Sequence, residues 1–218
     1  MHSAIHRFGV DKPQTTRYVK RMLQVLAAGL LLAAGSVFGA ETAPDALVKS
    51  TADEVLAVIK QNKDKSALRE IAEQKVVPHF DFKRMTQSAV GRAWRDATPA
   101  QQQALENGFR TLLVNTYTNA LSTAATGSEA VDVKPVKVGA DQNEVTVKTT
   151  IKDANKQVIP VDYRLEKSAA GWKVTDVVVE NLSLVTNYRS NFASEVSRSG
   201  IDGLIKALED KNRTVAKG

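Results

Sequence analysis

The change of hydrophobic period near Gly127 constrains the fold of this chain more than any other feature. Before it, apolar residues recur at helical spacing, as in Leu105, Phe109 and Leu112. After it, they recur at every second position, as in Val145 and Val147. A helix buries one stripe with a period near 3.6 and a strand buries every second residue. Helical spacing returns after residue 183, so the order of helices, sheet and helices predicts an α+β fold.

Start and stop signals bound the predicted helices. Thr98, Pro99 and Gln101 form the clearest start, because threonine caps, proline suits the first helical position and glutamine reaches back to the cap. Asp81 is a second candidate cap, and Gly91 and Gly200 are stop signals. We expect helices over residues 45–61, 66–77, 82–90, 99–122, 184–197 and 201–211.

Four segments of alternating hydrophobicity predict a four-stranded antiparallel meander. They cover residues 131–138 (bent at Pro135), 145–151, 161–165 and 172–179, with a turn at 153–155. A one-residue error of register would reverse the faces of a strand. One face of the sheet is expected to carry Val147, Thr149, Ile151, Val161, Tyr163, Leu165, Val174 and Val178.

The first forty residues have the pattern of a secretory signal peptide. A basic region with Arg7, Lys20 and Arg21 precedes the apolar residues 22–34, a stretch too short to cross a bilayer as a helix. Small residues follow, and cleavage after Gly39 or after Ala40 fits equally well; an uncleaved anchor is the alternative. We expect residues 1–40 to be removed on export and residues 41–218 to form a single domain in the periplasm.

Composition of the mature part argues against several classes of protein. The signal segment holds five of the 30 basic and one of the 24 acidic residues, which leaves 25 and 23, a net charge of +2. No basic patch for nucleic acid is therefore indicated. The chain has no cysteine, so its stability must come from the core and not from disulfides.

Residues for catalysis are scarce. Only His79 remains after processing, and no element that presents a nucleophilic serine or cradles a phosphate is present. His79, at a helix junction, fits a structural hydrogen bond better than a catalytic role. Asp176 is the one carboxylate that strand alternation points inward, where it would act as a general base; a salt bridge or a position on the outward face is the alternative. We expect no enzyme activity, no metal and no cofactor.

Two longer segments, residues 79–121 and 163–192, resemble the MlaC family of periplasmic phospholipid carriers, also called the toluene-tolerance auxiliary family. The most specific matches are HFDF at 79–82, the step from Gly91 to Trp94, GWKVTDV at 171–177 and SLVTNYRSNF at 183–192. A weaker likeness extends over residues 43–211. One departure is Asn181, where the family usually has glycine. Asparagine tolerates the left-handed conformation, so we expect the turn to be kept.

The resemblance implies a curved, NTF2-like sheet packed with the N-terminal and C-terminal helices. It also implies a monomeric carrier that holds a phospholipid by its acyl chains and carries no cofactor besides this cargo. The implied partners are an inner-membrane Mla-type ABC transporter complex and an outer-membrane lipoprotein–porin complex, between which the carrier maintains the lipid asymmetry of the outer membrane.

Apolar residues on the long helix and the sheet are the candidate lipid contacts. From these residues alone, an ordinary core and a cavity both remain open. An exported NTF2-like enzyme with a buried carboxylate and a ligand-free periplasmic adaptor are the alternative functions. Arg189 is placed to meet a phosphate or to lie exposed. The candidate lipid-binding set is Phe109, Leu113, Tyr117, Val147, Ile151, Val161, Tyr163, Val174, Val178, Val185, Tyr188 and Phe192.

Overall fold

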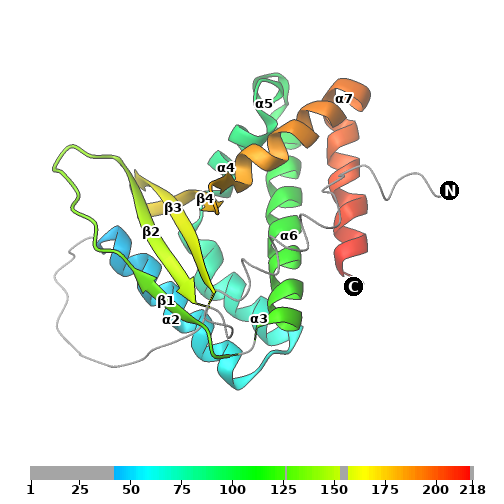
Figure 1. Cartoon of the computed structure of the whole chain (residues 1–218). Coiled ribbons are helices and arrows are strands. Elements are labelled where there is room, and N and C mark those ends of the chain that lie inside the picture. Colours follow the sequence, from blue (N-terminus) through cyan, green and yellow to red (C-terminus); the bar gives the residue numbers. More distant parts are fainter. Residues whose placement is uncertain (1–41, 126, 153–156, 217–218) are drawn as a thin grey trace.

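One antiparallel sheet and two groups of helices make up the computed structural model, which describes residues 42–125, 127–152 and 157–216. The sheet stands beside the long helix α6 (Pro99–Ala124), and the last helix, α7 (Leu184–Ala216), starts next to β4 and ends on the far side of α6 (Figure 1). The fold is α+β, as the sequence predicts. Residues 1–40, assigned to a signal peptide, and the turn assigned to 153–155 lie outside the described residues.

The described helices before α6 follow the predicted order, except that the short helix at Ala93–Asp96 was not predicted. They are α2 (Pro44–Gln61), α3 (Lys65–Ile71), α4 (Phe82–Val90) and α5 (Ala93–Asp96). The prediction of one helix over 66–77 is wrong beyond Ile71, where a π-helical turn, η1 (Ala72–Val76), and a 3₁₀ turn, η2 (Val77–His79), replace it. Pro78 has no N–H for an α-helical bond, which fits the tighter turn at this point.

Local capping signals are confirmed. The hydroxyl of Thr98 accepts from the N–H of Gln101, and the N–H of Thr98 donates to the side chain of Gln101, at 3.2 and 2.9 Å. The Asp81 carboxylate caps α4 by accepting from the N–H of Arg84 at 2.9 Å. The N–H of Asp81 also donates to Val174 O at 2.9 Å, which fastens the start of α4 to the sheet.

The sheet has five strands in the order β1-β2-β3-β4-β5, all antiparallel. They are β1 (Ala130–Val133), β2 (Glu144–Lys152), β3 (Val158–Ser168), β4 (Gly171–Val179) and β5 (Leu182–Ser183). The predicted count of four is corrected by β5, whose two residues were too few to show alternation. The first strand ends at Val133 and does not continue past Pro135, because proline cannot donate to the ladder.

The turn before β5 explains the departure at Asn181. Glu180 and Asn181 both have positive φ, at 49° and 67°, and they join Val179 to its partner Leu182. Two-residue hairpins of this kind need left-handed conformations at both positions. The expectation that asparagine keeps the turn is confirmed.

A β-bulge in β4 reverses the direction of the side chains halfway along the strand. Val174 pairs with Leu165 and Asp176 pairs with Arg164, which leaves Thr175 as an extra residue. Before the bulge Trp172 and Val174 face inward; after it Val177 and Val179 do, and Val178 is only half-buried. The expectation that Val178 shares the face of Val174 is therefore wrong, because an extra residue shifts the alternation by one.

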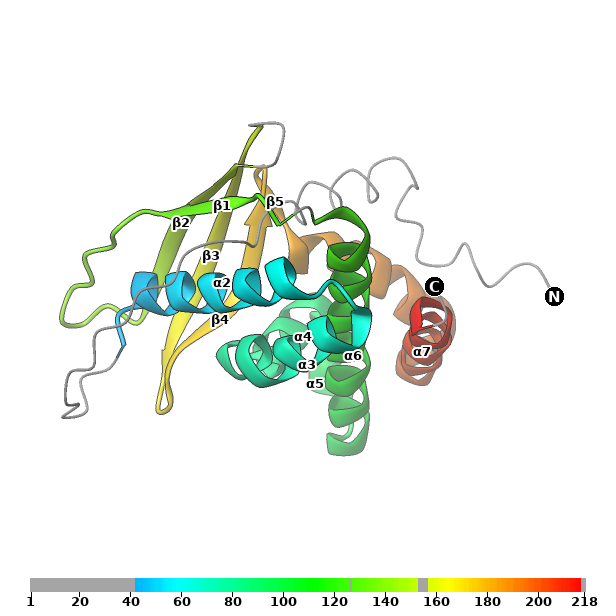
Figure 2. The same ribbon diagram turned by 90° about the horizontal axis from the view of Figure 1, so that it is seen from below.

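Helix α2 covers the inner face of the sheet, where Leu47 and Val48 pack against the apolar residues of β2–β4 (Figure 2). On the other side, α7 bends at Gly200, whose φ of 69° is not helical, and its second half runs beside α6 (Figure 1). Close contact there depends on Gly108, because a Cβ added to it would lie 3.2 Å from Leu208 Cβ. The predicted pair of closing helices separated by Gly200 is confirmed.

Candidate functional site

An apolar pocket lies between the inner face of the sheet and the helices that cover it. Its walls come from α2, from the segment α3–η2, from α6 and from strands β3 and β4. The cavity measures about 160 Å³. Lining it are Leu47, Val48, Thr51, Ala52, Val55, Leu68, Ile71, Ala72, Val76, Val77, His79, Phe80, Phe82, Leu113, Val114, Tyr117, Thr118, Leu121, Tyr163, Val174, Val177 and Leu184.

Polar groups on the wall of the apolar pocket are few. Thr118 is satisfied within its own helix, since its hydroxyl donates to Val114 O at 2.7 Å. The hydroxyl of Tyr163 makes no hydrogen bond to any described residue, and burial raises the pKa of Tyr163 to about 12. Burial also raises the pKa of Tyr117 well above its usual value. The pocket therefore offers a ligand a hydrocarbon surface with single hydroxyls.

His79 is the one ionisable base on this wall. Burial lowers the pKa of His79, and the nearby charge of Lys173 lowers it further. The side chain is thereby held neutral at neutral pH, which keeps the pocket without charge. Its side chain forms no hydrogen bond to another described residue, so the structural hydrogen bond expected of it is not found there.

The size of the apolar pocket sets what it holds in this conformation. An engineered apolar cavity of about 150 Å³ in another protein takes up benzene. A cavity of about 160 Å³ thus has room for a group of that size, and a whole acyl chain requires the walls to move apart. The π-helical turn is the least anchored wall, because no residue of η1 or η2 is buried.

Two ion pairs hold η1 to its neighbours. Lys75 Nζ lies 3.2 Å from the Glu54 carboxylate of α2, and Glu73 pairs with Arg110 of α6. All four side chains are more than a third exposed, and exposed pairs of this kind contribute about 0–1 kcal/mol each. The ion pairs of this wall are therefore weak, and its other ties include the packing of Val76 and Val77 and a hydrogen bond from Lys173 Nζ to Pro78 O.

Four of the predicted lipid contacts line the apolar pocket: Leu113, Tyr117, Tyr163 and Val174. The others lie elsewhere. Val147, Ile151 and Val161 belong to the core beneath α2, and Val178 lies on the opposite face of β4. The remaining four pack in the helical core between α6 and α7, where three of them form an aromatic cluster; they are Phe109, Val185, Tyr188 and Phe192.

Sequence reasoning did not include the N-terminal wall of the pocket. Val48, Ala52 and Val55 of α2 line it, together with Val76 and Val77 of the η segment. The apolar face of residues 45–61 was the available signal, but nothing in its spacing shows that it covers a cavity and not a filled core.

Asp176 is held by bonds on the outer face of β4. Its carboxylate accepts from the Ser183 hydroxyl at 2.7 Å and from the N–H groups of Val177 and Val185 at 2.9 and 3.2 Å. Arg164 Nη1 lies 3.3 Å from it. The carboxylate thus ties β4 to β5 and to the start of α7, which is the structural salt bridge that the sequence left open beside general-base catalysis.

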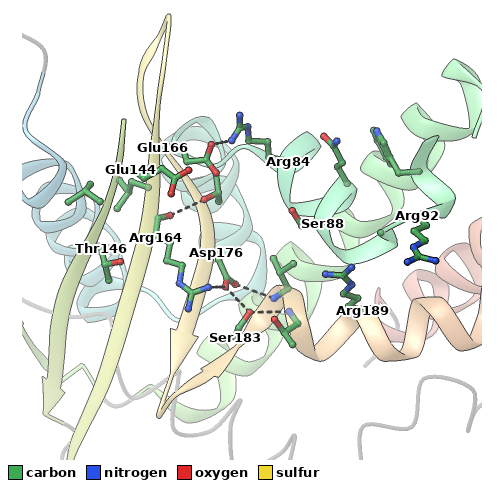
Figure 3. Close-up of a pocket in the computed structure, with 18 of the residues that line it drawn as sticks. Arg84, Ser88, Arg92, Glu144, Thr146, Arg164, Glu166, Asp176, Ser183 and Arg189 are labelled. Carbon is green, nitrogen blue, oxygen red and sulfur yellow. Dashed lines mark hydrogen bonds and ion pairs between the residues drawn. The ribbon is translucent and has the colours of Figure 1, made fainter. Parts of the chain in front are cut away.

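A second hollow, the arginine cleft, lies on this outer face between the sheet and helices α4, α5 and α7 (Figure 3). It is an open cleft of about 1090 Å³. Arg84, Arg92, Arg95 and Arg189 line its helical side and Glu144, Arg164 and Glu166 its sheet side. Arg189, the candidate phosphate ligand, lies here and not in the apolar pocket.

No group of three or more His, Asp or Glu side chains among the described residues is arranged to hold a metal ion. No helix in the described ranges is long and apolar enough to cross a membrane.

Comparison with known proteins agrees on one family. The model of the MlaC protein family matches residues 49–210. The toluene tolerance protein ttg2D of Pseudomonas putida is 30% identical over 90% of this chain and 94% of its own length. The intermembrane phospholipid transport system binding protein MlaC of Haemophilus influenzae is 24% identical over 78% of this chain and 82% of its own length.

A solved structure is also similar. The phospholipid-binding protein of Ralstonia solanacearum, determined in complex with a phospholipid, is 39% identical and superposes with a TM-score of 0.72. The match covers 79% of this chain and 98% of the other.

Proposed function

This chain belongs to the MlaC family, and from that premise we propose that it is a periplasmic carrier that binds a phospholipid by its acyl chains. The observation that carries the proposal is the apolar pocket, whose walls present hydrocarbon with almost no polar groups. A relative with the same fold was solved with a phospholipid bound, which supports the same class of ligand here.

The energetics of lipid transfer explain why such a pocket is needed. Two acyl chains contain roughly 30 methylene groups, and each is worth about 0.8 kcal/mol when it leaves water. Exposing both chains would therefore cost roughly 24 kcal/mol, which prevents free diffusion of the lipid. Transfer from a bilayer into an apolar pocket is much nearer to neutral, because the tails remain in hydrocarbon. The carrier needs no catalytic group and no energy source of its own.

Loading requires the apolar pocket to widen. We assign this movement to the segment η1–η2, because none of its side chains is buried and its ion pairs are exposed. Displacing it separates Ala72, Val76 and Val77 from Leu113 and Tyr117 on the opposite wall. Acyl chains then lie between α6 and the inner face of β3–β4, in contact with Leu113, Tyr117, Tyr163 and Val174.

The remaining parts of the proposal follow from the family. The carrier exchanges its lipid with an inner-membrane Mla-type ABC transporter complex and an outer-membrane lipoprotein–porin complex, and it acts as a monomer after removal of residues 1–40.

Asp176 has a structural role and is not a catalytic base, since its oxygens already accept bonds from three groups of the protein and lie beside Arg164.

Native mass spectrometry of protein purified from the periplasm tests the proposed function, with organic extraction of the same sample. The expected result is a mass excess that matches phospholipid, near one molecule per chain, with the same lipid in the extract. A bare protein mass after gentle preparation, and no phospholipid in the extract, would show that the pocket is only an incompletely filled part of the core. That result would favour the alternative function of a ligand-free periplasmic adaptor.

A further inference from the structure

Three arginines of the arginine cleft have no acidic partner. Among the described residues, the guanidinium groups of Arg92, Arg95 and Arg189 form no ion pair and no hydrogen bond. All three side chains are exposed. Arg92 directly precedes α5, Arg95 lies in α5 and Arg189 lies in α7. These elements are distant in the sequence and meet only in the folded protein.

Local structure positions this group. Gly91 ends α4 with a φ of 68°, and a Cβ at this position would lie 3.5 Å from Arg189 Nε. The Arg189 guanidinium thus lies against the backbone between α4 and α5. Figure 3 shows Arg92 and Arg189 on the same side of the cleft, across from the strands that carry Glu144 and Arg164.

Most of the other charged residues of the cleft form ion pairs within the protein. Arg84 pairs with Glu166, and Arg164 pairs with Asp176, so two of the three acidic residues are neutralised within the protein. Glu144 remains on the sheet side. The helical side is therefore uniformly positive, whereas the sheet side is mixed.

We propose that the arginine cleft is the docking site for an acidic segment of a partner protein, a stretch rich in Asp and Glu that lies along Arg92, Arg95 and Arg189. Guanidinium groups suit this role because they bind carboxylates in a planar, two-point geometry and are weakly hydrated. The proposal extends the proposed function, since a carrier must dock at membrane complexes, but the binding itself requires no lipid.

The shape of the site favours a protein segment over two other anions. A membrane surface is broad, and it would meet the rim of a concave cleft before it reached residues along its walls. A single phosphate is far smaller than a cleft of about 1090 Å³, and these three arginine side chains are exposed and do not enclose a buried anion site. A chain segment can enter a cleft and place successive carboxylates against successive arginines.

Fluorescence anisotropy with a short, fluorescein-labelled oligoglutamate peptide tests this proposal. The wild-type protein should bind the peptide at low ionic strength, and the affinity should fall as salt is added. The double variant Arg92→Glu, Arg189→Glu should bind roughly tenfold more weakly or not at all, because attraction becomes repulsion. The matched control is Lys137→Glu, Lys206→Glu, two exposed lysines outside the cleft with the same change of net charge, and it should bind nearly as the wild type does.

Equal weakening in the control would overturn the proposal, because it would show attraction to overall charge alone. So would binding of the wild type to vesicles containing anionic phospholipid that the double variant loses, or displacement of the peptide by low concentrations of inorganic phosphate, since each assigns the cleft to a different anion. No binding of the peptide by the wild type would overturn it as well. Lipid content, measured on the same samples, should not change, so a failure of docking is distinguished from a failure of lipid binding.

Discussion

The apolar pocket and the arginine cleft are built from neighbouring residues of the same two strands. Tyr163 lines the pocket and Arg164 lines the cleft; Val177 lines the pocket and Asp176 the cleft. Successive side chains on a strand point to opposite faces of the sheet. Two consecutive residues of one strand therefore line different hollows. The pocket is small, apolar and covered by α2, whereas the cleft is wide, charged and open.

One sheet keeps the proposed cargo site and the proposed docking site on opposite faces. Hydrocarbon on the inner face excludes water and charge from the pocket. Charge on the outer face, in contrast, remains hydrated until a partner displaces the water. Substitutions on one face should therefore change one property and leave the other, and the following predictions test that separation.

Filling the apolar pocket should give the largest effect. Ala72 is half-buried on the wall of the pocket, and Ala72→Trp should place an indole in the space that the acyl chains need. We expect bound phospholipid to be lost almost completely, as measured by native mass spectrometry. Ala207→Trp is the matched control, a half-buried helical alanine packed against the helical core away from the pocket. Retention of lipid by a folded Ala72→Trp variant would contradict the assignment of the pocket.

Removing the carboxylate that ties β4 to α7 should give the largest change in stability. Asp176→Ala leaves the Ser183 hydroxyl and the N–H groups of Val177 and Val185 without their acceptor. We expect the free energy of unfolding in urea to fall by about 3 kcal/mol. Arg164→Ala removes only the exposed partner and should cost under about 1 kcal/mol. Equal losses in the two variants would refute this account of Asp176.

Alkaline pH should lower the stability of the fold through ionisation of Tyr163 in the apolar pocket. This loss is expected at pH values at which the arginines of the cleft keep their charge. The pKa of Tyr163 is about 12 in the folded protein and near 10 in an unfolded chain. The stability due to its protonated form is complete below pH 10 and is lost as pH rises from 10 to 12, by up to about 1.4 kcal/mol per pH unit. Arginine keeps its charge over this range.

Urea titrations at several pH values between 9 and about 11 measure this slope. Tyr163→Phe should make it shallower. Tyr188→Phe, which removes a tyrosine whose pKa is also about 12 but which does not line the pocket, should reduce the slope similarly. Of these two contributions, only that of Tyr163 should change when lipid is bound, because Tyr188 does not line the pocket. A slope unaffected by either substitution would show that these hydroxyls are in contact with water.

Acid should give the smallest effect. The pKa of His79 is lowered in the folded protein by burial and then by Lys173. The stability due to its neutral form is therefore complete above about pH 6.5 and is lost as pH falls through the lowered value. The loss should be small, because the imidazole is only partly buried. His79→Gln should flatten the stability between neutral pH and about pH 5; an unchanged profile would place the acid sensitivity in other groups.

Local features were predictable from the sequence. The capping box at Thr98 and Gln101, the Asp81 cap, the break at Gly200 and the left-handed turn at Asn181 are all found where the residues place them. Each depends on a few consecutive residues, whose backbone preferences or side-chain bonds act over one turn. The pattern over residues 172–179 was predictable only up to the bulge.

The residues that line the apolar pocket were only partly predictable from the sequence. Tyr117 and Tyr163 line the apolar pocket, but Phe109 and Val147 belong to filled cores on either side of it. An apolar residue on a helix or strand looks the same in sequence whether it faces a neighbour or a cavity. The walls supplied by α2 and η1 were missed for this reason.

The α+β class, the succession of helices and strands, and the family are all evident from the amino-acid sequence, because periodicity, caps and motifs are properties of consecutive residues. Tertiary structure alone decided which side chains meet in each hollow. The extra residue Thr175 turns Val177 inward and Asp176 outward, and Arg189 lies beside Gly91 only because α7 packs against α4. These outcomes depend on strand register and helix packing, which are set by contacts between distant segments.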